Sequence, residues 1–139
     1  MKKIFLILVL CCMLLVGCSK KSKIICHSEQ IIQNNAYQTK YILEYQKDNL
    51  KKLEYDINVI IEQSNMPNYD SYYGAFIETF KKLGNEAGTL VSINKSSDGY
   101  QANIKIDYDE FNGNSSLMDN KLKRNDALNY LVNSGYKCE

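Results

Sequence analysis

The strongest constraint on the fold is a regular alternation of side-chain type over two neighbouring segments, residues 37–45 and 53–61. In both segments every second residue is aromatic, aliphatic or Thr, and the residues between them are mostly charged or amide-bearing. Successive side chains of a strand point to opposite faces of a sheet, so this pattern predicts two strands with one buried and one wet face. Lys47-Asp48-Asn49 lies between them and has the composition of a turn, which favours an antiparallel hairpin.

Strand patterns also flank this hairpin. Residues 24–32 form a weakly patterned strand before it, and residues 89–93 and 100–108 form a second pair of strands after it. Ser96-Ser97-Asp98-Gly99 is predicted to join the second pair as a hairpin loop. Together these segments predict an antiparallel sheet.

Two helices are predicted where the apolar residues change to helical spacing. The first lies between the two strand pairs, with Asn68 as its N-cap and Gly84 as its C-terminal stop. Its apolar positions are Tyr69, Tyr72, Tyr73, Phe76, Phe80 and Leu83. The second begins around Asn125 and stops at Gly135. The order β-β-β-α-β-β-α predicts a single α+β domain over residues 24–139, an antiparallel sheet of about five strands covered by two helices.

The N-terminus has the pattern of a bacterial lipoprotein signal. Two lysines directly after Met1 precede thirteen uncharged residues, 4–16, too few for a bilayer-spanning helix of about twenty residues. Leu15-Val16-Gly17-Cys18 follows and matches a lipobox, with an aliphatic residue three places before Cys and a small residue directly before it. We therefore predict that residues 1–17 are a signal peptide, removed by cleavage between Gly17 and Cys18. An ordinary secretory peptide with an incidental cysteine is the alternative.

Lipidation of Cys18 is expected to fix the location of the protein. Its thiol is expected to carry a diacylglyceryl group, with palmitate among the acyl chains, and two chains give durable anchoring where one gives only marginal binding. Residues 18–23 then form a short tether, in which Lys20, Lys21 and Lys23 either attract anionic lipid or are simply solvated. The domain is predicted to lie at the extracytoplasmic face of the cell membrane, held there by the lipid.

Two cysteines, Cys26 and Cys138, are left to pair if Cys18 carries lipid. Cys11 and Cys12 lie in the segment that is discarded. The compartment outside the plasma membrane permits disulfides, and a bond between Cys26 and Cys138 closes nearly the whole domain. A loop of that size is worth about 4.7 kcal/mol in the chain-entropy description. Two free thiols or a metal-binding pair are the alternatives.

The sequence shows no recognisable constellation of catalytic residues. His27 is the sole histidine of the chain, and alternation directs it to the outer face of the sheet, away from Cys26. Asp107, Asp109 and Glu110 suggest calcium, but their spacing does not fit an EF-hand loop, and a solvated strand end is the better interpretation. The sequence therefore predicts no enzyme, no metal and no cofactor.

The charge of the chain limits its partners. After loss of the signal, fifteen Lys and Arg stand against sixteen Asp and Glu, scattered along the chain. A near-neutral balance without a basic stripe gives no basis for nucleic-acid binding.

Tyrosine is unusually abundant, with eleven residues and no Trp. Its apolar body and polar tip suit binding surfaces as well as cores. Those on the buried stripes of the predicted strands are Tyr37, Tyr41, Tyr45, Tyr55, Tyr100 and Tyr108. For these, core packing is favoured over a tyrosine-lined ligand groove. Tyr72 and Tyr73 are adjacent, and a helix cannot bury both equally, so this pair marks the predicted interaction surface.

In the order of its segments the chain resembles the small YehR-like lipoproteins. The resemblance rests on the lipobox, on YYGAFIETFKKLGNEAG in the predicted first helix, on ANIKIDYDEF at the end of the strand pair, and on GYKC after the last helix. It covers most of the mature chain and implies the same fold and location. That family is largely uncharacterised, so the resemblance implies no activity and no catalytic residue.

These observations favour a non-enzymatic interaction domain that binds a protein, a peptide or an envelope component near the membrane. The alternative is a small-molecule binding or carrier domain with a Tyr-lined cavity between sheet and helix. An enclosed pocket among Tyr41, Tyr55 and Phe76 is the feature expected of that alternative.

Overall fold

A six-stranded antiparallel sheet organises the protein, in the spatial order β4-β5-β3-β2-β1-β6. The structure is a computed structural model that describes residues 20–113 and 115–139. The strands are β1 (Lys21–Ile32), β2 (Asn35–Gln46), β3 (Asn49–Ile60), β4 (Thr89–Lys95), β5 (Gly99–Asp107) and β6 (Lys137–Cys138). The helices are η1 (Gln63–Asn68), α2 (Tyr69–Lys81), η2 (Leu83–Asn85) and α3 (Arg124–Asn133). The predicted α+β class and the order βββαββα are confirmed.

Three long strands form the centre of the sheet, and tight turns join them. β2 and β3 pair over nearly their whole length, with Tyr41 opposite Tyr55, and β1 pairs with β2 over twelve residues. Gln33 and Asn34, between β1 and β2, both have positive φ, at 51° and 66°. Positive φ at both central residues is the geometry of a turn whose twist matches the flanking strands. Lys47 in the next turn also has positive φ, at 57°.

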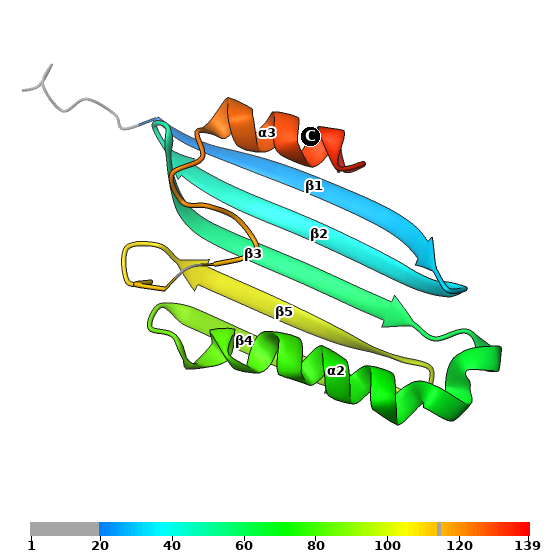
Figure 1. The fold of residues 1–139 in the computed structure, drawn as a ribbon. Coiled ribbons are helices and arrows are strands. Elements are labelled where there is room, and N and C mark those ends of the chain that lie inside the picture. The colour runs from blue at the N-terminus through cyan, green and yellow to red at the C-terminus, as the bar shows by residue number, and fades with distance from the viewer. Residues whose placement is uncertain (1–19, 114) are drawn as a thin grey trace, which may run out of the picture.

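The core lies on one face of the sheet, and both α-helices pack on that face. Figure 1 shows α3 lying along β1 and α2 lying along β4. Phe80 of α2 and Leu131 of α3 belong to one buried cluster with Leu43 and Leu53 from the centre of the sheet. We call this the covered face. The opposite face carries the polar half of the alternation, and we call it the open face.

The disulfide between Cys26 and Cys138 is present. It joins two directly paired residues of β1 and β6, and Ile25 and Glu139 exchange backbone hydrogen bonds beside it, at 3.2 and 2.9 Å. β6 is a sixth strand that the sequence did not reveal, because two residues carry no readable period. The bond therefore fixes β6 to the edge of the sheet and also links the two ends of the domain.

Several boundaries differ from those predicted. β1 begins at Lys21, so the last three residues of the tether predicted over 18–23 belong to the sheet. Pairing with β2 extends the strand through lysines that carry no apolar signal. Gly84 lies within η2, after α2 has ended at Lys81, and does not have a positive φ. Asn68 occupies the N-cap position of α2, but its side chain makes no capping hydrogen bond. The predicted cleavage and lipidation residues, Gly17 and Cys18, lie outside the described residues.

Candidate functional site

The open face contains a hollow of about 530 Å³ near the middle of the sheet. Side chains from five strands, β1 to β5, surround it. Those that point to the open face are His27, Glu29, Gln38, Lys40, Asp56, Asn58, Asn94, Gln101 and Asn103. We call this the open-face hollow. Most of its lining side chains are amide-bearing or charged, although carbon atoms provide much of its exposed surface.

Strand register brings these residues together from distant parts of the sequence. Lys40 lies opposite His27 on one side and Asp56 on the other, and Asp56 lies opposite Asn103. These four residues form one row across β1, β2, β3 and β5. Cross-strand neighbours on one face have Cβ atoms about 5 Å apart, so each row is a continuous polar strip.

The next row toward the β1–β2 turn is held by amide hydrogen bonds. The Asn58 side-chain amide donates to Gln38 Oε1 at 3.1 Å, and the Gln38 amide donates to Glu29 Oε1 at 3.3 Å. Gln101 lies opposite Asn58 and completes the row. Two successive bonds in one direction set the orientation of the amides before any ligand arrives.

Asn103 forms a second polar cluster at the side of the hollow. Its Nδ2 donates to Glu54 Oε1 at 2.8 Å and to Asp56 Oδ1 at 2.5 Å. The hydrogen bond from Asn103 holds the pKa of Glu54 below its usual range, and the Lys105 ammonium 3.2 Å away adds to this effect. The Asn103 amide therefore holds both carboxylates in place.

Four residues of the hollow retain unused hydrogen-bonding capacity. In the described part of the chain, the side chains of His27, Lys40, Asn94 and Gln101 make no hydrogen bond and no ion pair. His27, Lys40 and Gln101 are exposed, as alternation predicted for His27. The hollow thus offers both donors and acceptors to a polar ligand, and two carboxylates, Glu29 and Asp56, stand against one lysine, Lys40.

An apolar row borders the hollow toward the β1–β2 turn. Ile31, Ala36 and Ile60 lie opposite one another on β1, β2 and β3 and point to the open face. Ile31 is 75% exposed and Ile60 is 40% exposed. We call these three residues the isoleucine row. Exposed apolar residues beside polar groups are typical of protein-binding surfaces.

The predicted interaction residues, Tyr72 and Tyr73, lie on the covered face instead. Both are half-buried against a cluster that contains Val59 and Tyr100. The Tyr73 ring lies 5.7 Å from the Tyr100 ring and 6.4 Å from the Tyr69 ring. The structure therefore does not bring this pair together with the open-face hollow, and much of their surface is used in packing α2 onto the sheet.

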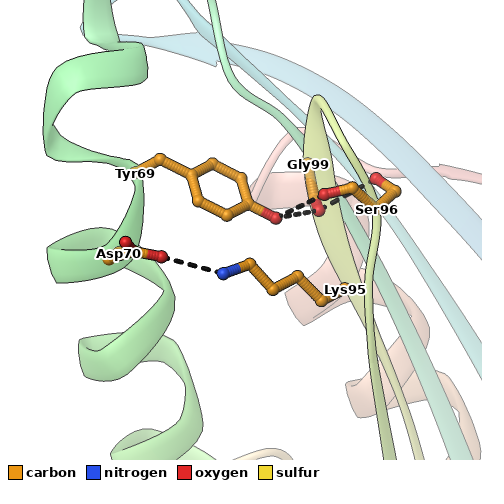
Figure 2. A network of polar contacts seen from close by, with 5 residues as sticks. All are labelled: Tyr69, Asp70, Lys95, Ser96 and Gly99. Atoms are coloured by element: carbon orange, nitrogen blue, oxygen red, sulfur yellow. Dashed lines mark hydrogen bonds and ion pairs between the residues drawn. The ribbon is translucent and has the colours of Figure 1, made fainter.

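A polar network secures the start of α2 beside these rings (Figure 2). The Tyr69 hydroxyl donates to the carbonyl oxygens of Ser96 and Gly99, both at 2.7 Å. Lys95 Nζ lies 2.8 Å from Asp70 Oδ1, and 4.7 Å above the centre of the Tyr69 ring. These contacts join the first turn of α2 to the β4–β5 turn, so the network is accounted for by the fold.

The tyrosines at the centre of the covered face fill the space between sheet and helices. The Tyr41 and Tyr55 rings lie 4.6 Å apart, and Tyr136 packs against Tyr41 at 5.4 Å. Burial raises the pKa of both Tyr41 and Tyr55. Phe76 lies elsewhere, 4.5 Å from the Tyr100 ring. An open cleft of about 370 Å³ beside the end of α2 includes only Tyr55 among the tyrosines. Tyr41 and Phe76 do not line this cleft.

Two of the three acidic residues at the end of β5, Asp107 and Asp109, are used in ion pairs, and Glu110 forms none with a described residue. Asp109 Oδ1 lies 2.6 Å from Lys51 Nζ, and Asp107 lies 3.5 Å from Lys52. Among residues 20–113 and 115–139, no three His, Cys, Asp or Glu side chains are grouped so as to hold a metal ion. None of the described helices is long and apolar enough to span a bilayer.

Comparison with known proteins supports the fold alone. No protein-family model matches the chain, and no curated protein matches it in sequence. Among solved structures it is similar to a protein from Streptococcus pneumoniae TIGR4 whose structure was determined by NMR, with a TM-score of 0.58 and 11% identity. The alignment covers 89% of this chain and 88% of that chain. At this identity the likeness shows a shared architecture, and the resemblance to YehR-like lipoproteins stays a prediction.

Sequence reasoning singled out His27 from the open-face hollow but not the hollow itself. The sequence did contain an indication of the hollow, on the strand positions that alternate with the buried ones. Asn is uncommon in strands, yet these positions include three Asn residues and one Gln: Asn58, Asn94, Asn103 and Gln101. These amides can be seen to lie together only when the order of the strands in the sheet is known. The sequence pattern does not give that order.

Proposed function

We propose that the protein is a lipid-anchored extracytoplasmic domain that binds a protein, a peptide or another envelope component through the open face of its sheet. The observation that carries the proposal is the open-face hollow, about 530 Å³ in volume and bordered by the isoleucine row. The binding is not coupled to catalysis in this proposal, because the His27 side chain makes no hydrogen bond to an acid or a nucleophile among the described residues.

The composition of the surface favours a polymer over a small apolar molecule. Amides pre-oriented by the Asn58–Gln38–Glu29 hydrogen bonds suit the repeated amide or hydroxyl groups of a polymer chain. Ile31 and Ile60 supply an apolar contact beside them, as in interfaces where a few buried apolar anchors are surrounded by polar contacts. The alternative of a Tyr-lined carrier cavity lacks this support, because the Tyr41 and Tyr55 rings pack against each other.

Photo-crosslinking in intact cells tests the proposed surface. A crosslinking residue in place of Gln101, inside the hollow, is expected to trap a discrete partner. The same residue in place of Tyr130, which is 58% exposed on α3, is the matched control. Substitution of Lys40 by Glu in the Gln101 reporter should abolish the adduct without changing protein abundance. Equal adducts from both positions, or no effect of the Lys40 substitution, contradict binding at the hollow.

The lipid anchor has a separate test. Metabolic labelling with a fatty-acid probe is expected to label the protein, and Cys18→Ala should remove the label. Persistent label on the Cys18→Ala protein contradicts the assignment of Cys18. Because this experiment does not involve the open face, the anchor and the binding surface can fail independently.

A further inference from the structure

The chain enters the sheet at the end that carries the β2–β3 turn. The Lys47 amide donates to the Lys20 carbonyl at 3.0 Å, and Lys21 lies opposite Gln46 at the start of β1. Cys18 precedes Lys20 by two residues, which span at most about 7 Å. If Cys18 carries lipid, as proposed above, this end of the sheet is held beside the bilayer. We call it the anchor end.

Cations without ion-pair partners gather at the anchor end. Lys20, Lys21 and Lys47 make no salt bridge in the part of the chain that the structure describes. The start of α3 lies at the same end, because the Tyr45 hydroxyl donates to the Leu122 carbonyl at 3.1 Å. Arg124, the first residue of α3, likewise has no salt bridge among the described residues.

The other strand lysines at this end are paired with carboxylates. Lys23 lies 3.6 Å from Glu44, Lys51 pairs with Asp109 after β5, and Lys52 pairs with Asp107 at the end of β5. Paired lysines contribute little net charge.

Carboxylates without ion pairs among the described residues lie at the same end: Asp48 in the β2–β3 turn, Glu110 after β5 and Asp126 in α3. Lys121 and Lys123, which precede α3, add to the unpaired cations, so this end keeps a small excess of positive charge that attracts an anionic surface.

The far end of the sheet has the opposite charge. Glu29, Glu62, Asp70 and Asp98 lie near the β1–β2 turn, the end of β3, the start of α2 and the β4–β5 turn. Lys95 is the single lysine among them and pairs with Asp70. The other three carboxylates accept hydrogen bonds from uncharged side chains, which leaves their charge in place. Charge thus changes sign along the strands.

We propose that the anchor end docks on anionic phospholipid headgroups, so that the strands project away from the membrane. The acidic far end is repelled by the same surface, which favours one orientation over the reverse. The two acyl chains supply the durable attachment, and the lysines set the direction. At the usual rise per residue, β1 carries Ile31 of the isoleucine row about 33 Å from its start at Lys21. The open face then stands clear of the bilayer.

Site-specific fluorescence quenching on vesicles tests the orientation. The lipidated protein is reconstituted in phosphatidylcholine alone or with added phosphatidylglycerol, both containing a headgroup-linked quencher. In the mature chain Cys26 and Cys138 are joined and Cys18 is proposed to carry lipid, so one added cysteine can be labelled selectively. Asn49→Cys reports on the anchor end and Ser97→Cys on the far end.

The probe at 49 is expected to be quenched at least about fivefold more strongly in anionic vesicles than in phosphatidylcholine alone. Fivefold corresponds to the attraction of about 1 kcal/mol that one lysine gains near an anionic surface. The probe at 97 should be quenched less in anionic vesicles than in phosphatidylcholine alone, because the acidic far end is repelled by the anionic surface. Concentrated salt should return the probe at 49 to its value in phosphatidylcholine, because it screens the attraction.

Charge reversal provides the matched comparison. Lys21→Glu with Lys47→Glu should abolish the lipid-dependent quenching at 49, whereas Lys40→Glu with Lys137→Glu, at exposed positions away from the anchor end, should leave it intact. Equal quenching at 49 in both lipids, or equal effects of the two double variants, overturns the proposal. A protein that fails to float with phosphatidylcholine vesicles instead lacks its lipid, which overturns the proposed anchor.

Discussion

The two faces of the sheet are built from the same strands but have opposite chemistry. The covered face holds all six tyrosines that belong to strand stripes, together with Leu43 and Leu53, which are almost completely buried. The open face holds amides, charged groups and the isoleucine row, and no described helix covers it. The side chains of one face are used in packing, and those of the other retain hydrogen-bonding capacity.

This difference separates residues that stabilise the fold from residues that are available for binding. A buried tyrosine must satisfy its hydroxyl inside the protein, and Tyr45 and Tyr69 do so through backbone carbonyls. An exposed amide such as Gln101 has no such requirement, because water satisfies it until a ligand replaces the water. The abundance of tyrosine is therefore explained by packing. The candidate binding residues are exposed amides and charged side chains, none of which has an unusual sequence pattern of its own.

The largest expected effect is alkaline unfolding driven by the covered face. Burial raises the pKa of Tyr45, Tyr100 and Tyr108 to about 12. The unfolded chain releases these protons near pH 10 and the folded chain retains them. The free energy of unfolding should therefore be constant below about pH 10 and should fall between about pH 10 and 12.

Circular dichroism and phenolate absorbance, recorded together, measure this transition. The buried tyrosines should titrate together with unfolding. Titration of every tyrosine near pH 10, with the fold intact, contradicts the packing described for the covered face.

Loss of the disulfide ranks next. Cys26 and Cys138 are separated by 112 positions, and the chain-entropy description assigns about 4.7 kcal/mol to closure of a loop near this size. The Cys26→Ala, Cys138→Ala protein should lose about that much of its free energy of unfolding, measured by urea titration. Reductant should destabilise the wild type by a similar amount and leave the double variant unaffected. A difference below about 1 kcal/mol indicates that the unfolded chain is already compact.

A pair of neighbouring substitutions compares the two faces directly. Leu43 is buried on the covered face, and Leu43→Ala should lower the free energy of unfolding by about 2–5 kcal/mol because it leaves a cavity. Ile42 points to the open face, and Ile42→Ala should cost about 1 kcal/mol or less. Urea titration of both variants gives the two losses in free energy of unfolding, which can then be compared. Similar losses indicate that the open face is itself covered by another part of the protein or by a second molecule.

The smallest expected effect concerns the start of α2. Tyr69→Phe removes the hydroxyl that donates to Ser96 and Gly99, and should lower the free energy of unfolding by about 1 kcal/mol. Tyr130→Phe is the matched control and should cost nothing measurable. Hydrogen exchange at the β4–β5 turn should accelerate in the Tyr69 variant only. Unchanged exchange there means that α2 is held by ring packing and not by these bonds.

The sequence predicted the fold class because the covered face dominates the pattern. Alternation over residues 37–61 and helical spacing after Asn68 located the central hairpin and α2 correctly. The first strand was placed three residues late, since Lys21 and Lys23 owe their strand conformation to pairing with β2. η1 was missed because a short 3₁₀ segment that contains Pro67 has no periodic signal.

The candidate site was much less predictable than the fold. Tyr72 and Tyr73 attracted attention as adjacent aromatic residues, but both have ring or packing partners under α2. The open-face hollow depends on β5 lying beside β3, which places Asn103 opposite Asp56. No local pattern specifies that crossover. Information about long-range pairing, which a single sequence does not contain, was the missing element.

The pairing of β1 with β2 has a mechanical consequence. If the lipid holds the start of β1 and a partner holds the open face of β2, β3 and β5, tension between them runs along the strands. The twelve paired positions of β1 and β2 would then bear the load together in shear, because no single pair at the end of the ladder has to break first. The bond from Cys26 to Cys138 passes the same tension to α3. A sheet held in this way resists extension best along the direction of its strands.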